Sequence, residues 1–341
     1  MNFVKFLIQR ILASIPLLIA ISLVSFGLIK AVPGDYADMW MSRAMAMSGQ
    51  GYDVLKPQAD ALREHLGLNK PFIIQYFHWV WGIFTEWDFG PSFVQSRPVT
   101  EVMGLRLPRS LGLALTAHVF ATLIGAGLGI YAALNQYKLG DILATVIAFI
   151  GITVPKFIIS LVILYYLAFV LHSQYIGSLF SAEYVLQEHW SLGKFIDFLK
   201  HVWPVLAISI MAGQAYTLRM MRGNLLDVMK MPYIETARAK GLSERRIIFL
   251  HALPNALHPI IMNQGSRLDY MIKGEIEIAI TMGIPTIGPL ILTSVYQRDM
   301  YVVASIFILV AVMMILGNLI ADILLALLDP RVRKATIGRE A

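Results

Sequence analysis

Residues 233–254 read YIETARAKGLSERRIIFLHALP, a basic stretch that separates two long apolar segments. The whole chain has 341 residues, of which 57% are hydrophobic and only 15% are charged. Soluble domains are about 45–50% apolar and about 25% charged, so this composition is typical of a protein embedded in a bilayer. The quoted stretch is therefore predicted to be a loop that emerges from a membrane.

Six apolar stretches are long enough, at about 20 residues each, to cross the hydrocarbon core as helices. They are 8–31, 109–134, 142–171, 203–225, 256–282 and 303–328. The first is too long for the core of a signal peptide, and no A-x-A site follows it, so we expect an uncleaved span. The sequence predicts an all-α integral membrane protein with six transmembrane helices.

The positions of lysine and arginine predict the orientation. The loop at 226–255 is rich in basic residues, whereas acidic residues outnumber basic ones in the segment 32–108. Short basic loops stay in the cytoplasm, so we expect this loop and both termini to be cytoplasmic. Three regions follow: 1–31 with the first span, an external segment 32–108, and a five-helix core 109–341 that carries the cytoplasmic loop at about 226–255.

Two features inside the spans predict how helices pack. The GAGLG sequence does not have the spacing of a dinucleotide loop, but Gly125 and Gly129 are four residues apart and allow another helix to approach closely. Pro155 is expected to kink the third span. Lys156 beside it is an intramembrane cation, which is costly unless it faces protein or water.

The sequence offers no catalytic constellation. It has no cysteine, no G-x-x-x-x-G-K-[ST] loop, no H-E-x-x-H and no G-x-S-x-G elbow. We therefore expect neither an enzyme nor a metal site. The formal net charge of +6 fits membrane topology better than a nucleic-acid partner.

The basic loop is predicted to be a helix, a glycine turn and a second helix. Pro232 is at a favoured first helical position, and Glu235 follows in the first turn, where a carboxylate suits the helix dipole. Gly241 can adopt the left-handed conformation that ends a helix. Ser243 can cap a second helix, which Pro254 is expected to terminate or kink.

A topological anchor would explain only the charge of this loop. The small residues Thr236, Ala237 and Ala239, together with the glycine break, favour a compact knob that fits the groove of a partner.

The loop resembles the EAA signature of binding-protein-dependent ABC importer permeases. The matching positions are Glu235, Thr236, Ala237, Gly241, Leu253 and Pro254. The resemblance to the oligopeptide/dipeptide/nickel permease subfamily covers essentially the whole chain, through VPGD at 32–35, LGLNKP at 66–71, FGPSF at 89–93, LPRSLGLAL at 107–115 and LLDPRVR at 327–333.

This resemblance implies a type I ABC importer permease fold with a cytoplasmic coupling helix. A second, homologous permease would complete the pathway, two cytoplasmic ATPase subunits would bind ATP and Mg, and an external or periplasmic solute-binding protein would deliver the cargo. This chain would hold no cofactor. Its role in coupling to the ATPase would fall on Glu235, Thr236, Ala237, Ala239, Gly241, Leu253 and Pro254.

The resemblance also implies a multi-pass protein of the bacterial cytoplasmic (inner) membrane. The expected cargo is an oligopeptide or dipeptide. An oligosaccharide or a nickel complex is the alternative within the family, and an ATPase-independent secondary transporter is the rival outside it.

The fifth span departs from the family pattern. Its relatives have a glycine-rich, nearly uncharged stretch here, but this chain carries Arg267, Asp269, Lys273, Glu275 and Glu277. Asp269, Lys273 and Glu277 are spaced so that they share one helix face. They form a ladder at the interface between permease subunits, or they line the pathway, since intramembrane charges generally face a cavity. A third alternative is that the span boundary is misplaced and the charges lie at the membrane interface. A carboxylate-lined pathway would suit amines or hydroxyl groups.

Overall fold

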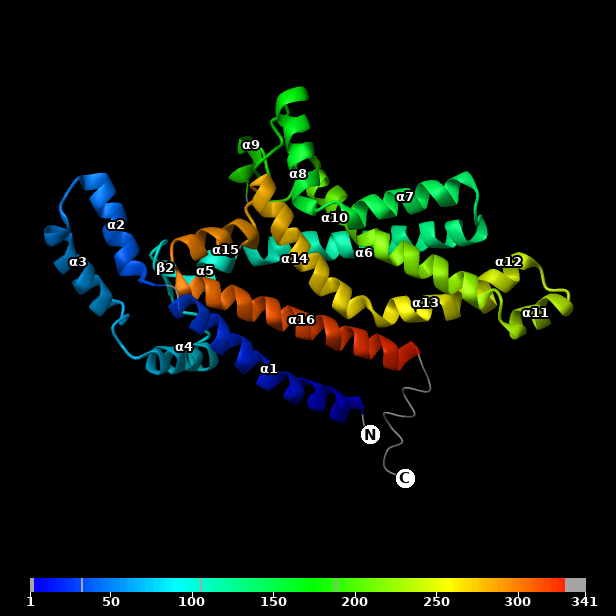
Figure 1. The fold of residues 1–341 in the computed structure, drawn as a ribbon, viewed down its shortest axis with the longest axis horizontal. Coiled ribbons are helices and arrows are strands. Elements are labelled where there is room, and N and C mark those ends of the chain that lie inside the picture. Colours follow the sequence, from blue (N-terminus) through cyan, green and yellow to red (C-terminus); the bar gives the residue numbers. More distant parts are fainter. Residues whose placement is uncertain (1–2, 32, 105, 188, 329–341) are drawn as a thin grey trace. The chain divides into compact units, whose positions relative to one another are not determined.

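The computed structural model describes residues 3–31, 33–104, 106–187 and 189–328 (Figure 1). These residues form helices and one short hairpin, and they divide into two compact units. We call the described residues of Met1–Arg10, Ser110–Pro285 and Met314–Ala341 the core unit. Ile11–Arg109 and Thr286–Met313 form the hairpin unit.

Three long helices have residues in both units. They are α1 (Phe3–Ala31), α6 (Arg106–Leu134) and α16 (Met300–Leu328). The other elements of the core unit are α7 (Leu139–Thr153), α8 (Lys156–Tyr165), the π-helix η1 (Tyr166–Val170), α9 (Ala182–Val185), α10 (Leu192–Val228), α11 (Pro232–Ala239), α12 (Glu244–Ile247), the π-helix η2 (Ile248–Ala252), α13 (Leu253–Met262) and α14 (Gln264–Met282). Those of the hairpin unit are α2 (Tyr36–Ser48), α3 (Tyr52–His65), α4 (Phe72–Glu86), β1 (Pro91–Ser92), β2 (Arg97–Pro98), α5 (Val99–Gly104) and α15 (Ile287–Tyr296).

Among the described residues, four helices are long and apolar enough to cross a membrane. They are α1, α6, α10 and α16. Two bent pairs, α7 with α8–η1 and Ile272–Met282 with α15, raise the number to six if each pair is one span. The fold is therefore a multi-pass helical membrane fold, as the sequence predicts, with β1 and β2 as a minor antiparallel exception. The fifth span predicted at 256–282 corresponds to α13 and α14.

Helix α10 is the centre of the core unit and contacts α7, α8, α13 and α14 (Figure 1). Glycines allow two other helices to approach it. A Cβ atom at Gly125 would lie 2.6 Å from the carbonyl oxygen of Gln214, and one at Gly129 would lie 2.6 Å from Cβ of Met221. The small-residue pair on α6 therefore packs on α10, which confirms the predicted helix contact. Gly151 of α7 approaches α10 in the same way.

Pro155 produces more than a kink. Helix α7 ends at Thr153, Val154 is extended, and α8 starts at Lys156, with about 100° between the two helix axes. The residue before a proline is driven away from helical backbone angles, so the helix stops here and restarts in a new direction. This bend brings Lys156 against α14, which contacts α8.

Pro254 was predicted to terminate or kink the second loop helix, and the prediction of termination is wrong. Helix α12 passes into the π-helix η2, which passes into α13, where Pro254 occupies the first turn. A π-turn is wider than an α-turn, so it relieves the clash between the proline ring and the preceding turn.

The hairpin unit is held by an aromatic cluster and by polar caps. Phe26, Tyr76, Trp79 and Phe93 pack together in its core. Asp35 of the PGD turn caps α2 through a reciprocal bond pair with Asp38. Helix α3 ends at His65, and Gly67 follows with a φ of +65° and donates to the carbonyl of Glu64, which completes the turn after the helix.

Candidate functional site

The predicted coupling loop, at about 226–255, forms a helix–turn–helix at one end of α10 (Figure 1). Pro232 is the first residue of α11, as predicted. Gly241 has a φ of +76° and donates to the carbonyl of Arg238, while Leu242 donates to that of Ala237. This bond pattern is a Schellman motif, which requires a left-handed residue and therefore favours glycine. Ser243 is the residue before α12, but its hydroxyl makes no capping hydrogen bond.

One face of α11 belongs to the core. Ile234 and Ala237 are buried against Met221 and Leu225 of α10. Ile247, Ala252 and Ala256 extend this cluster, and Leu253 packs on it half-buried. Ala237 is thus small because it packs inward, not because it is part of the exposed knob.

The opposite face of α11 is exposed. It presents Glu235, Thr236 and Ala239, and beyond them the exposed Gly241 turn. The hydroxyl of Thr236 donates a hydrogen bond to the carbonyl of Pro232 at 3.0 Å. Pro254 is also exposed, at the start of α13. Four of the seven predicted coupling residues therefore form one accessible surface at the tip of the loop.

An ion pair closes the turn between α11 and α12. Arg238 Nε lies 2.6 Å from Glu244 Oε1, and its Nη2 donates to Oε2 at 3.4 Å. The hydrogen bond from Arg238 lowers the pKa of the Glu244 carboxyl, so the pair stays charged at neutral pH. This pair was not predicted from the sequence, although opposite charges on either side of a predicted glycine turn are a usable signal.

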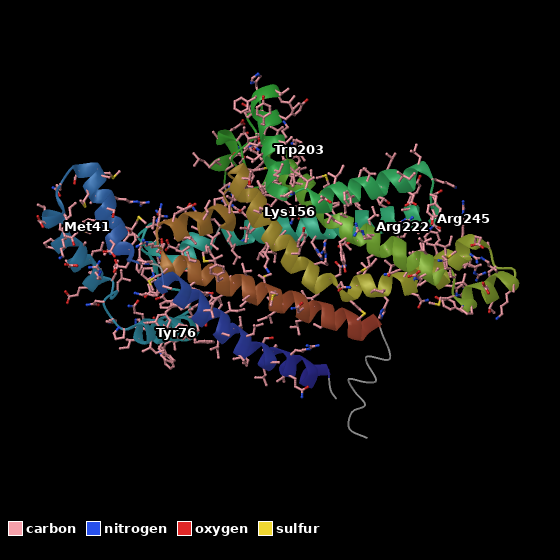
Figure 2. All side chains as sticks on the ribbon, viewed as in Figure 1. Met41, Tyr76, Lys156, Trp203, Arg222 and Arg245 are labelled. Carbon is pink, nitrogen blue, oxygen red and sulfur yellow. The ribbon has the colours of Figure 1, made fainter. Side chains whose placement is uncertain are left out.

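A second ion pair ties α7 to the same end of α10. Arg222 donates through Nε and Nη2 to the two oxygens of Asp141, at 2.7 and 2.8 Å (Figure 2). Asp141 also accepts from the amide of Tyr137 at 2.9 Å. A bidentate pair of this kind is geometrically specific, so it fixes the position of α7 on α10.

The charged residues of α14 have different surroundings, and the predicted ladder of Asp269, Lys273 and Glu277 stays a prediction. Glu277 accepts from the amide of Phe157 at 3.3 Å and attracts Lys156, so it is directed toward α8. Lys273 is exposed and Glu275 is buried. The side chain of Asp269 lies outside the described residues.

Arg267 stacks on aromatic rings. Its guanidinium carbon lies 4.1 Å from the ring centroid of Tyr216 and 4.7 Å from that of Tyr270. Lys156 (Figure 2), expected from the sequence only as a costly intramembrane cation, lies with its Nζ 4.0 Å from the Tyr270 ring centroid. Only the bend at Pro155 and the packing of α8 on α14 bring these side chains together.

The FGPSF motif is anchored by a residue from the distant end of the chain. Asp299, just before α16, accepts from Ser92 Oγ at 2.5 Å and from the amides of Phe93 and Val94 at 3.2 and 3.3 Å. Burial raises the pKa of Asp299, and the hydrogen bonds only partly offset this. The contacts of the FGPSF motif therefore serve to stabilise the hairpin unit.

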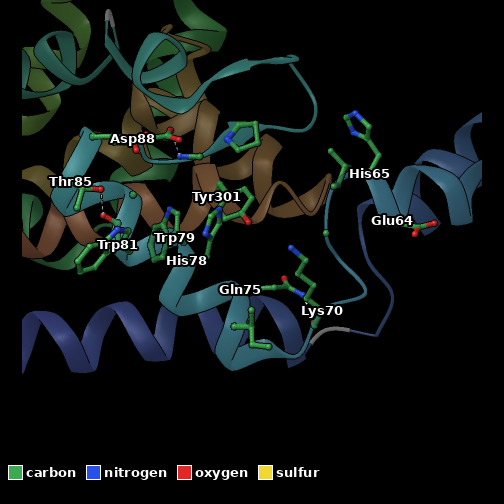
Figure 3. Close-up of a pocket in the computed structure, with 17 residues that line it drawn as sticks. Glu64, His65, Lys70, Gln75, His78, Trp79, Trp81, Thr85, Asp88 and Tyr301 are labelled. Carbon is green, nitrogen blue, oxygen red and sulfur yellow. Dashed lines mark hydrogen bonds between the residues drawn. The ribbon is translucent and has the colours of Figure 1, made fainter.

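The hairpin unit also contains a pocket of about 570 Å³ (Figure 3). Its lining includes His78, Trp79, Trp81, Asp88 and Tyr301. Gln75 lines it as well and donates to the carbonyls of Leu68 and Lys70. Parts of the LGLNKP and FGPSF motifs line this pocket, but none of the predicted coupling or pathway residues does.

Membrane-length helices with an exposed helix–turn–helix at one end are the arrangement expected of a transport permease subunit. The chain belongs to the binding-protein-dependent transport system inner membrane component family, whose profile matches residues 125–334. A second profile, for the N-terminal part of such membrane components, matches residues 3–114. The family consists of permease subunits of ABC importers and not of enzymes.

Several named proteins are similar over nearly their whole length. The oligopeptide transport system permease protein AppB of Bacillus subtilis is 34% identical, over 96% of this chain and 98% of the relative. The dipeptide transport system permease protein DppB of Escherichia coli is 30% identical with the same coverage. Among solved structures, the inward-facing MetNI methionine ABC transporter has a TM-score of 0.49 at 15% identity, covering 66% of this chain and 97% of the other.

Proposed function

We propose that this chain forms, with a second homologous permease, the membrane pathway of an importer for oligopeptides or dipeptides. Two cytoplasmic ATPase subunits bind ATP and Mg, an external binding protein delivers the cargo, and this chain holds no cofactor. The names of AppB and DppB support the cargo. We place the protein in the bacterial cytoplasmic membrane with both termini inside, because the loop at 226–255 is basic.

The observation that carries the proposal is the two-sided packing of α11. Its exposed face, with Glu235, Thr236 and Ala239, is available to a partner. Its other face is buried, with Ile234 inaccessible to solvent and Ala237 6% exposed. Burying an aliphatic side chain stabilises by about 1.5–3 kcal/mol, so α11 is not a freely moving appendage.

This packing gives α11 a mechanical connection to the spans. The buried face of α11 contacts α10 through Met221 and Leu225, and the same cluster continues into α13 through Ala256. Closely packed interiors are barely compressible, so a displacement of the exposed face is transmitted to α10 and α13. ATPase closure would act on the pathway through this connection.

The experiment is a mild-detergent purification of the tagged chain, with the co-purifying subunits identified and ATPase activity measured. We expect two ATPases, a sister permease and an external binding protein whose addition stimulates ATP hydrolysis. Recovery of the chain alone, without ATPase activity, would replace the importer with an ATPase-independent transporter. A binding protein that holds an oligosaccharide or a nickel complex would change the cargo and leave the importer in place.

A further inference from the structure

We infer that Arg267, held between Tyr216 and Tyr270 and supported by Lys156, binds the carboxylate of the transported peptide. This inference rests on the proposed peptide importer and adds a recognition group within its pathway.

The cluster consists of two cations arranged around one tyrosine. Tyr270 lies 4.7 Å from the Arg267 guanidinium carbon and 4.0 Å from Lys156 Nζ, both measured to the ring centroid. The ring of Tyr216, on α10, lies on Arg267 at 4.1 Å. Three helices, α8, α10 and α14, therefore each contribute a group. Ring faces attract cations, so these contacts fix the two charges in position without neutralising them.

The backbone of α14 makes room for the lysine. A Cβ atom at Gly274 would lie 1.8 Å from Lys156 Nζ, a separation that no packing rearrangement short of moving the lysine could accommodate. Lys156 is only 7% exposed, so its ammonium group is enclosed by protein. An enclosed cation is costly, and its retention in a membrane helix points to a function.

The described side chains that act electrostatically on Arg267 are one lysine, one histidine and two tyrosines. Glu277 is the acidic side chain that attracts Lys156, and it also accepts from the amide of Phe157. His118, on α6, lies within electrostatic range of Arg267 and adds a group that can only become more positive. Within the described part of the chain, no carboxylate lies within ion-pair distance of the Arg267 guanidinium.

The cluster is accessible. Tyr270 is 40% exposed, and Arg267 is partly exposed beside it. A guanidinium that stacks by its faces keeps its N–H groups at its edge, where two of them match the two oxygens of a carboxylate. Such a charge-assisted pair is about twice as strong as a neutral hydrogen bond. The chemistry of the cluster therefore favours an anionic carboxylate over the amines and hydroxyl groups expected from the acidic residues of α14 alone.

The test uses the complex purified with its partner subunits and reconstituted in ATP-loaded vesicles. Its probes are dialanine and trialanine, each as the free acid and as the C-terminal amide. The variants are Arg267→Gln and Arg267→Lys, with Lys138→Gln as a control that removes an exposed lysine outside the cluster. The binding protein is the same in every assay, so a difference between variants originates in the permease.

We expect Arg267→Gln to lower uptake of the free acids about tenfold, as for loss of a charge-assisted hydrogen bond, and to leave amide uptake unchanged. Uptake of the free acids by Arg267→Lys should lie between that of wild type and that of Arg267→Gln, because lysine retains the charge but loses the planar fork. Equal losses for acids and amides, or normal uptake of both, would overturn the inference. Loss of the sister permease from the purified variant would instead make Arg267 an interface residue.

Failure of the proposed function has a different signature. If the wild-type complex shows ATPase activity stimulated by its binding protein but takes up neither acids nor amides, peptide import is wrong, and the carboxylate site is overturned with it. If wild type takes up free acids, the proposed function stands and the comparison of variants decides the inference alone.

Discussion

Arg238 and Glu244 form an ion pair across the turn at Gly241, with Nε and Oε1 2.6 Å apart. Both side chains are largely exposed, so the pair adds little to global stability. Its effect is local, because it joins the last turn of α11 to the first residue of α12. The orientation of the proposed coupling surface, formed by Glu235, Thr236, Ala239 and Gly241, thus depends on this turn. The turn requires a residue in the left-handed backbone conformation.

Substitution of that glycine should uncouple transport. Gly241→Val places a β-branched residue at a φ of +76°, which costs about 1–2 kcal/mol and disfavours the turn. We expect stimulated ATPase activity to fall while the protein still inserts and assembles. Gly49→Val is the matched control, since Gly49 has a φ of +67° and, like Gly241, has open space around it. Equal effects of the two variants on ATPase activity would remove the coupling role of the turn.

The glycines of α6 should differ according to what faces them. Gly125→Ala directs a methyl group to within 2.6 Å of a backbone oxygen of α10, so we expect a loss of about 1–3 kcal/mol from overpacking. Gly127→Ala meets nothing within 4 Å and should be neutral or slightly stabilising, because alanine has the higher helix propensity. Thermal unfolding of the two variants measures the difference. Identical unfolding temperatures would contradict the close approach of α6 and α10.

The Asp141–Arg222 pair should behave as a unit. Asp141→Ala leaves a partly buried guanidinium without its bidentate partner, and breaking a buried pair costs about 3–5 kcal/mol. That figure is an upper estimate here, because the Arg222 side chain is 26% exposed and can recruit water. The double variant Asp141→Ala/Arg222→Leu should be more stable than Asp141→Ala alone, as measured by thermal unfolding. A double variant less stable than either single one would show that the two groups act independently.

Asp299 should give the hairpin unit a pH-dependent stability. Burial raises its pKa above the ordinary 3.8, so its contribution is complete below that value and is lost as the pH rises through the raised folded value. Asp299→Asn keeps acceptor and donor groups but cannot ionise, so it should remove this part of the dependence of stability on pH. The measurement is the unfolding temperature of wild type and variant over a pH range that extends below and above 3.8. Parallel curves would contradict a raised pKa.

Asp35 makes the stability of the same unit depend on pH in the opposite direction, and this dependence serves as a reference for Asp299. Burial alone would raise its pKa, but hydrogen bonds from Arg63 and from the backbone bring the pKa below its ordinary value. Its contribution is present above 3.8 and is lost as the pH falls through the lower folded value. Asp299→Asn should leave this acid-side loss unchanged.

The absence of cysteine makes the topology testable with single introduced cysteines. Gln50 and Arg245 are both exposed, in the segment 32–108 and in the coupling loop respectively. A membrane-impermeant maleimide should label Gln50→Cys in intact cells and Arg245→Cys only after permeabilisation, because the basic loop is expected inside. The reverse pattern of labelling would invert the proposed orientation.

Local chemistry is why much of the coupling loop was predictable from the sequence. Pro232 and Gly241 each impose a backbone preference that no distant contact needs to supply, and both bound α11 where expected. The small pair Gly125 and Gly129 likewise predicted a close helix contact, which the structure shows. The sequence could not predict the fate of Pro254, because a π-turn upstream of the proline depends on how α12 and α13 pack.

Hydropathy and turn chemistry are properties of neighbouring residues, so the sequence was sufficient to predict a multi-pass helical membrane protein with a helix–glycine turn–helix loop. Tertiary structure alone decided which groups meet. It turned α8 by about 100° after Pro155, placed Lys156 on Tyr270, and directed Glu277 toward the start of α8. It also joined Asp299 to Ser92 across two hundred residues of chain. Such contacts depend on the packing of whole helices, which no local pattern specifies.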